Sequence, residues 1–446
     1  MREAAPLDLW VVDPARFSAV HDADFVRERT LEAYGKHYEI AWPQLEYESA
    51  RPRLTSPLYG RLKTRGAVFG SKLGWERANW FAPPGAEPVD RPSQGQANWF
   101  EAVGAEHAAC REGVVLFDQS SFAKFEIWGR SAAERLEWLA ANRIARPVGG
   151  LVYTQLLNGR GGIEADVTVA RLAADTFYMV TGTGFRTHDG GWLREHLTGG
   201  GVAVEDVTEA WSTLTLMGPR ARDVLSAVTT ADLSSAVFPF GTARLISIAD
   251  CAVRALRVTY VGELGWELHV PAGNAGTVFD ALMMAGAPFG IRLAGYRAIE
   301  SLRLEKGYRA WGAEITPRDS PFEAGLGWAV KLASGIDFLG REASLAIAAA
   351  PLSRRLCGFT VARPDLLLTG RETILRDGEA VGYLASGGWG YTVGTHIGYG
   401  YVRRETGVDD AWLRAGSWEL VVAGETVAAT LAMRPLYDPK GLRIKV

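Results

Sequence analysis

The stretch Leu151–Leu172, LVYTQLLNGRGGIEADVTVARL, decides how the chain is organised. Apolar and β-branched runs stand on either side of Asn-Gly-Arg-Gly-Gly, residue types that supply the positive φ angles of a tight turn, so the stretch predicts a β-hairpin. The pleat of its second strand sends alternate side chains to opposite faces. One face therefore presents Glu164, Asp166 and Thr168, and the other presents Ile163, Ala165, Val167 and Val169. An acid beside a hydroxyl is either the wet outer face of an ordinary strand or part of a binding site.

A second hairpin is predicted in RVTYVGELGWELHV, residues 257–270. Strand residues Arg257–Tyr260 and Trp266–Val270 flank a four-residue loop, which predicts that Tyr260 lies opposite Glu267 as a cross-strand pair. Two hairpins that offer acids, a short donor and a ring suit a flat heterocycle, because its faces can stack and its ring N–H groups can donate to a carboxylate. The alternative is two unrelated surface hairpins.

Composition limits the class of protein. The chain has 446 residues, of which 48% are hydrophobic and 22% charged, values typical of a globular protein with two to four domains. Its 48 basic residues against 51 acids give a formal charge of −3, so no basic field would recruit nucleic acid or an anionic membrane, and a small-molecule partner is expected. The three widely spaced cysteines predict buried free thiols and no metal site. No apolar run has the length of a membrane span or signal peptide, so we expect a cytoplasmic protein.

Changes in composition and in the pattern of predicted helices and strands along the chain predict three globular units and a leading segment. Residues 1–97 are expected to form an N-terminal extension, with a helix over Ala23–Gly35 and then irregular chain that wraps the rest. Its basic and aromatic run, residues 56–81, could bind single-stranded nucleic acid, but the acidic net charge favours packing on the protein itself. Residues 98–345 alternate helices with antiparallel strands, with a boundary near 205. Residues 346–446 predict a small antiparallel β-barrel or sandwich.

Several motifs together resemble the folate-dependent one-carbon transferases related to the aminomethyltransferase (T-protein) of glycine cleavage, and in particular the C-terminal portions of dimethylglycine and sarcosine dehydrogenases. They are GAVFGSKLGWERANWF (66–81), LFDQSSFAKF (116–125), VYTQLLNGRGGIEADVTV (152–169), LMGPRA (216–221), YVGELGWELHV (260–270) and GYRAIESLRLEKGYRAWGAEITP (295–317). The resemblance implies an α+β cloverleaf of three domains, two antiparallel α/β units and one β-barrel, around a central channel that holds tetrahydrofolate.

The resemblance also implies roles for single residues. Asp166 matches the aspartate that reaches the N5 and N10 region of tetrahydrofolate and keeps the attacking nitrogen nucleophilic. The implied folate contacts are Thr168, Tyr260, Glu267 for the N–H donors of the pterin, and the backbone at Gly182 or Thr183. The T-protein has an arginine where this chain has Ile299, with Arg297 two positions away, which argues against aminomethyl transfer from a lipoyl carrier protein.

The related dehydrogenases carry an FAD-binding domain before this region, whereas this sequence has no flavin fingerprint. The function expected first is therefore a tetrahydrofolate-dependent demethylase that moves an intact methyl group from an O-, N- or S-methylated small molecule, such as a methoxylated aromatic acid, to N5. His21 is expected to protonate the leaving group, with His37, Tyr59 and, less favoured, His188 as other candidates. One alternative is the folate subunit of a flavoprotein amine dehydrogenase, forming 5,10-methylenetetrahydrofolate. Another is a folate-binding module without turnover.

Overall fold

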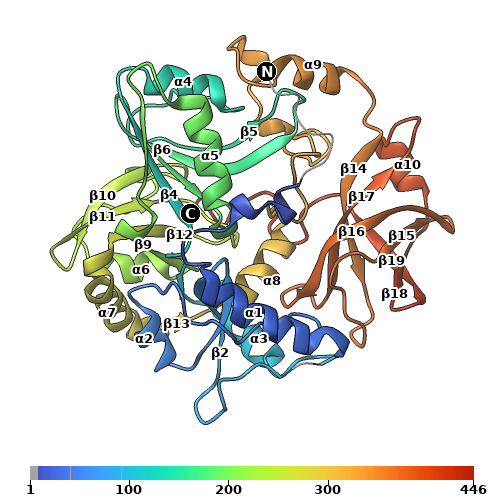
Figure 1. Cartoon of the computed structure of the whole chain (residues 1–446), viewed down its shortest axis with the longest axis horizontal. Coiled ribbons are helices and arrows are strands. Elements are labelled where there is room, and N and C mark those ends of the chain that lie inside the picture. Colours follow the sequence, from blue (N-terminus) through green and yellow to red (C-terminus); the bar gives the residue numbers. More distant parts are fainter. Residues whose placement is uncertain (1–8, 41, 92) are drawn as a thin grey trace.

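The computed structural model describes residues 9–40, 42–91 and 93–446. The first eight residues of the predicted extension, with Ala41 and Pro92, lie outside the described residues. A five-stranded sheet, a six-stranded sheet and a closed barrel form three lobes around the centre of the molecule (Figure 1). This architecture confirms the predicted α+β class with a C-terminal barrel. In the described part of the chain, no helix is long and apolar enough to cross a membrane.

The five-stranded sheet contains the hairpin that was predicted first. Its strands are antiparallel and lie in the order β5 (Leu151–Leu157), β6 (Ile163–Ala173), β7 (Thr176–Thr181), β4 (Ala123–Trp128) and β8 (Ala203–Asp206). Helices α4 (Ala132–Leu139) and α5 (Arg186–Leu197) cover one face with buried leucines. Of the alternate β6 residues predicted to be apolar, Ala165, Val167 and Val169 pack in this core, and Ile163 is buried in a neighbouring cluster, so the predicted division of β6 into two faces is confirmed.

The six-stranded sheet takes strands from distant parts of the sequence. Their order is β10 (Ala243–Ile248), β11 (Cys251–Leu256), β12 (Gly265–Pro271), β9 (Trp211–Met217), β3 (Val115–Asp118) and β13 (Arg292–Leu293). Helices α6 (Ala221–Ser226) and α7 (Ala275–Gly286) pack on it around the buried Trp266. Because β3 precedes residue 205 and pairs with β9, which follows it, the two sheets interleave along the chain.

The uncovered faces of the two sheets face each other. A small apolar cluster joins them, with Tyr178 and Val180 from β7 and Ala243 and Leu256 from the second sheet. A hydrogen bond of 3.0 Å between the Tyr178 hydroxyl and Nδ1 of His269 crosses the same layer. Side chains that point into this layer from either sheet are therefore brought together by the fold.

The C-terminal unit is a closed barrel, which decides between the two architectures predicted for it. Its strands follow the order β14 (Arg354–Val361), β17 (Thr395–Arg403), β16 (Glu379–Gly390), β15 (Thr373–Arg376), β18 (Trp418–Val422) and β19 (Glu425–Ala432). The interior is filled by fully buried Phe359, Ile374, Leu384 and Leu420. Helix α9 (Arg341–Ala349) leads into the barrel, and α10 (Asp410–Ala415) lies beside it.

The leading segment contains more regular structure than predicted. Helix α1 (Ala23–Gly35) has the predicted bounds, but the irregular chain expected after it includes α2 (Tyr59–Lys63) and a hairpin of β1 (Ala67–Lys72) and β2 (Trp75–Phe81). The hairpin turns at Leu73 and Gly74, which both have positive φ. Trp75 and Trp80 of the basic and aromatic run are buried, so their rings are not available to stack on bases.

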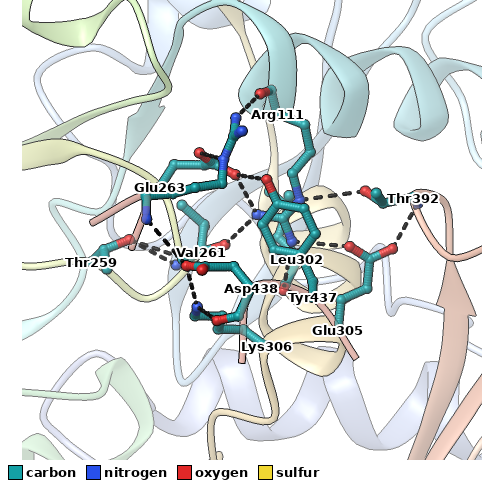
Figure 2. Close-up of polar contacts among 12 residues, drawn as sticks. Arg111, Thr259, Val261, Glu263, Leu302, Glu305, Lys306, Thr392, Tyr437 and Asp438 are labelled. Carbon is teal, nitrogen blue, oxygen red and sulfur yellow. Dashed lines mark hydrogen bonds and ion pairs between the residues drawn. The ribbon is translucent and has the colours of Figure 1, made fainter. Parts of the chain in front are cut away.

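A buried ion-pair network ties the six-stranded lobe to helix α8, the barrel and the C-terminal tail (Figure 2). Arg111, at the end of α3 (Phe100–Glu112), lies 3.0 Å from a carboxylate oxygen of Glu263 and 3.0 Å from one of Glu305 on α8 (Tyr296–Lys306). All three side chains are at most 5% exposed. Further hydrogen bonds reach this group from Thr392 before β17 and from Tyr437 in the C-terminal tail. One guanidinium thus connects the loop before β12, helix α8, the barrel and the chain end.

Replacing Arg111 with methionine should lower the free energy of unfolding by about 3–5 kcal/mol, because it leaves two buried carboxylates without their shared cation. The matched control is Arg27→Ala, which removes an exposed pair with Asp24 and should change stability by less than about 1 kcal/mol. Urea denaturation followed by fluorescence measures both. Equal midpoints for the two variants would contradict the role given to Arg111.

Candidate functional site

The β5–β6 hairpin directs its polar residues into the layer between the two sheets. Gln155 lies opposite Asp166 and Tyr153 opposite Thr168 in the antiparallel register. At the turn, the Asn158 side-chain oxygen accepts the backbone N–H groups of Arg160 and Gly162, at 2.9 and 3.0 Å. This closed turn fixes the register, so the acid and the hydroxyl of β6 stay on the inner face.

Asp166 is a half-buried carboxylate with neutral partners. Gln155 donates a side-chain hydrogen bond of 2.8 Å to one of its oxygens, and Tyr153 donates another. Burial raises the pKa of Asp166 to about 6, although these two hydrogen bonds lower it, and the negative charge of Asp189 raises it further. Among the described residues, no cation forms an ion pair with Asp166. The carboxylate therefore changes its charge close to neutral pH.

Tyr260 does not lie opposite Glu267, so this part of the sequence prediction is wrong. Strand β11 ends at Leu256, which is the residue that pairs with Glu267. Beyond it, the Thr259 hydroxyl accepts the backbone N–H groups of Val261 and Gly262 and turns the chain out of the ladder. The Tyr260 hydroxyl instead donates to the carbonyl of Arg309 at 2.8 Å.

Tyr260 nevertheless belongs to the neighbourhood of Asp166. Its ring stacks on that of Tyr308, with centroids 6.0 Å apart and planes 19° apart. Burial raises the pKa of the Tyr260 hydroxyl, and the negative charge of Asp166 contributes in the same direction. The structure thus brings Asp166 of the first hairpin close to Tyr260 of the second stretch. The loop after β11 places Tyr260 there, and not a cross-strand pairing with Glu267.

Glu267 projects from β12 into the same layer between the sheets. It alternates with Trp266 and Leu268, which are buried on the other face, and its own side chain is 12% exposed. One carboxylate oxygen lies 3.6 Å from Nε2 of the buried His269. Lys124 of β4 is fully buried nearby, and burial lowers its pKa to about 7. Asp166 and Glu267 are therefore on facing surfaces of two different sheets.

The remaining predicted residues divide into two groups. Gly182 and Thr183 follow β7, and the Thr183 hydroxyl is 2.8 Å from that of Ser121 in a buried pair. His21 packs between the rings of Phe17 and Phe25 in the leading segment, at centroid distances of 5.0 and 4.8 Å. These contacts do not include the β5–β6 hairpin.

The two other candidates in the leading segment also make local contacts. His37 is exposed beside Tyr38, and Tyr59 packs on Phe69 at a centroid distance of 4.5 Å. Protonation of a leaving group by His21, His37 or Tyr59 stays a prediction.

The structure places one further group of polar side chains beside Asp166, and it includes His188, the least favoured of the predicted proton donors. His188, on α5, contacts Asp189 through Nδ1 at 2.8 Å and Glu164 of β6 through Nε2 at 3.5 Å. Glu164 points to the same face as Asp166, two residues away. The adjacent His-Asp pair and the second acid of β6 were visible in the sequence, but their meeting depends on the packing of α5 on the sheet. The described residues contain no group of three or more His, Cys, Asp or Glu placed to hold a metal ion.

Two layered sheets and a closed barrel, with acids on the facing surfaces, define an aminomethyltransferase-like fold. A family model described as the GCVT N-terminal domain matches residues 58–334, and one described as the glycine cleavage T-protein C-terminal barrel domain matches residues 354–438. The chain belongs to the glycine cleavage T-protein family, as the resemblance of its motifs predicted. A third model, the FAD dependent oxidoreductase central domain, matches residues 4–56.

Similar proteins include enzymes that are longer than this chain. It is 38% identical over 439 residues to the 4-methylaminobutanoate oxidase (formaldehyde-forming) of Paenarthrobacter nicotinovorans, covering 98% of this chain and 52% of that protein. It is 37% identical over 481 residues to mouse mitochondrial sarcosine dehydrogenase, with the same coverages. The chain therefore spans about half the length of these relatives. Among solved structures, the aminomethyltransferase T of Bartonella henselae matches with a TM-score of 0.73 and 26% identity, covering 86% of this chain and 98% of that one.

Asp166→Asn should stabilise the folded protein at pH 7.5. The folded-state pKa of about 6 lies above the ordinary aspartate value of 3.8, so the ionised carboxylate destabilises the fold above pH 6. The variant should therefore gain about 1–3 kcal/mol at pH 7.5, and the gain should shrink as the pH falls from 6 towards 4. Thermal unfolding at pH 7.5 and 4.5 measures it, with the exposed Asp175→Asn as control. A gain independent of pH would contradict the assignment.

Proposed function

We propose that this chain binds tetrahydrofolate between its two facing sheets and uses it to accept a one-carbon unit that originates as the N-methyl group of a methylated amine. Membership of the T-protein family supports the folate, and the names of the two relatives, which refer to methylated amines, support the source of the carbon. The methoxylated aromatic acid expected from the sequence has no support among them.

The residues present fit a reduced pterin, which carries a row of N–H donors along its ring edge. The layer supplies acceptors for them, namely the carboxylates of Asp166 and Glu267 and a buried side-chain oxygen of Gln155 that has no hydrogen-bond partner among the described residues. The stacked rings of Tyr260 and Tyr308 offer an aromatic surface beside these acceptors. In this assignment Glu267 and Thr168 hold the ring system, and the backbone at Gly182 or Thr183 adds a contact.

The single observation that carries the proposal is the environment of Asp166. When bound, tetrahydrofolate supplies amine nitrogens that attack an electrophilic carbon. A carboxylate with a pKa of about 6 is ionised above that pH, so it can accept a hydrogen bond or a proton from such an N–H group. Its half-buried position strengthens that interaction, because less water screens the charge than at an exposed site.

A flavoprotein partner would determine the oxidation level of the transferred carbon. The match of residues 4–56 to a flavoprotein central domain and the longer oxidases among the relatives favour a carbon first oxidised to the level of formaldehyde by a flavin. Capture by folate then forms 5,10-methylenetetrahydrofolate, with the flavoprotein as partner. Transfer of an intact methyl group to N5, which the sequence alone favoured, forms 5-methyltetrahydrofolate instead.

The experiment supplies the purified chain with tetrahydrofolate and sarcosine or dimethylglycine labelled with ¹³C in the methyl group, with and without a flavoprotein that oxidises the amine. We expect labelled 5,10-methylenetetrahydrofolate only when the flavoprotein is present, formed faster than the spontaneous condensation measured without the chain. Asp166→Asn should lower the enzymatic rate at least about 100-fold, because a positioned acid or base contributes that much.

Mass spectrometry of the folate product distinguishes the alternatives. Labelled 5-methyltetrahydrofolate without the flavoprotein would replace methylene formation by intact methyl transfer. Calorimetry of the wild-type chain with 5-formyltetrahydrofolate, a stable analogue, tests binding separately, and an absence of binding heat would overturn the proposal. Normal binding without catalysis under either condition would instead identify a non-catalytic module.

A further inference from the structure

Three carboxylates and one imidazole lie together at the inner end of the β5–β6 hairpin. Glu164 and Asp166 point to one face of β6, and Asp189 of α5 is almost fully buried behind them. His188 lies between two of the acids, 2.8 Å from Asp189 and 3.5 Å from Glu164. The imidazole thus pairs with two acidic groups, and one of them, Glu164, shares its face of β6 with Asp166, the proposed catalytic residue.

The contacts that other elements of the described chain make with Asp166 come from neutral groups. Strand β5 provides Gln155 and Tyr153, and the 257–264 loop provides Tyr260. Arg309, from the loop after α8, directs its guanidinium to the carbonyl oxygens of Ala324 and Gly307 instead. The neighbouring charge that acts on Asp166 is that of Asp189, which is paired with His188.

Aromatic rings cover the imidazole on its open sides. Trp10, from the leading segment, contacts the His188 ring at a centroid distance of 4.9 Å, and Trp311 contacts it at 5.7 Å. The His188 side chain is only 14% exposed beneath them. Aromatic rings stabilise a nearby cation and exclude the water that would screen its charge, so the effect of His188 on its acidic neighbours is stronger than that of a surface histidine.

We propose that His188 is a positioning residue for the one-carbon transfer: its imidazolium, held between Glu164 and Asp189, offsets their negative charge and thereby keeps the Asp166 carboxylate ionised and ready to accept an N–H group of folate. This inference rests on the proposed function. It assigns to α5 and to the leading segment a part in tuning the site, without direct contact between His188 and the reacting atoms.

The titration of these groups agrees with the geometry. Burial disfavours the charged imidazole, but hydrogen bonds from it to Asp189 and Glu164 outweigh burial and raise the pKa of His188 to about 9. The ring is therefore a cation at neutral pH. Burial raises the pKa of Asp189, while His188 and a hydrogen bond from Thr181 lower it. Because the charge of Asp189 raises the pKa of Asp166, loss of the imidazolium should raise the pKa of Asp166 as well.

Two substitutions should shift the pH dependence of folate binding in opposite directions. Binding of 5-formyltetrahydrofolate should weaken as the pH falls and Asp166 becomes protonated, which gives the pH profile an acidic limb. His188→Gln removes the positive charge, so this limb should move to higher pH by about one unit. At pH values below the limb this corresponds to about tenfold weaker binding, with little change at pH 8.5. Asp189→Asn removes a negative charge and leaves Glu164 to hold the imidazolium, so its limb should move to lower pH. A purely structural role for His188 would weaken binding equally at all pH values.

Calorimetry from pH 5 to 9 measures these limbs, and the pH profile of turnover should shift in parallel. The Asp166→Asn variant is the control that should lack the limb. If His188→Gln fails to fold, as judged by circular dichroism, the shift of Asp189→Asn to lower pH tests the inference alone, and an unshifted limb there overturns it. Normal binding with the wild-type limb in His188→Gln overturns the inference and leaves the proposed function intact. A wild-type chain that binds no folate overturns both.

Discussion

The guanidinium of Arg111 is the group on which the arrangement of the molecule depends. It lies under the ring of Tyr437, 3.8 Å from the ring centroid, and donates to the carbonyl oxygens of Val261 and Leu302 as well as to Glu263 and Glu305. The 257–264 loop, which carries Tyr260 to the candidate site, is thereby fixed to α8 and to the C-terminal tail. Planar, multiply bonded arginine suits this role because five donors can satisfy several buried acceptors at once.

Local patterns predicted most of the elements. The helix Ala23–Gly35 has the expected bounds, because the side chain of Asp22 caps its first turn. The β1–β2 hairpin was missed because Leu73-Gly74 is not one of the common turn pairs. The entry of β3 into the second sheet follows from contacts about 100 residues apart in the chain, which no local pattern records.

In the candidate site, too, the sequence predicted local features but not contacts between distant segments. The inner face of β6 could be read from the two-residue period alone. The pairing of Tyr260 with Glu267 failed because Thr259 bends the chain, and because Arg257 is drawn away to the carbonyl oxygens of Phe238 and Val446. The group around His188 could not be predicted, since Glu164 and Asp189 meet it only after α5 has packed on the sheet.

The buried Glu305 and the half-buried Asp166 show how this fold gives a structural acid and a candidate catalytic acid different charge states. Burial alone would raise the pKa of both Glu305 and Asp166. At Glu305 the charges and hydrogen bonds of His107 and Arg111 overcome burial and lower the pKa to about 2, so this carboxylate stays ionised wherever the protein is folded.

Among the described residues, only an amide and a phenol donate to the Asp166 carboxylate, and its pKa of about 6 leaves it able to exchange a proton near neutral pH. The difference lies in the direct partners: Arg111 lies 3.0 Å from Glu305, whereas among the described residues no cation pairs with Asp166 and His188 contacts the neighbouring acids Glu164 and Asp189 instead. Glu305 stays charged because a cation pairs with it directly. Asp166 can accept a proton near neutral pH because its hydrogen-bond donors are neutral.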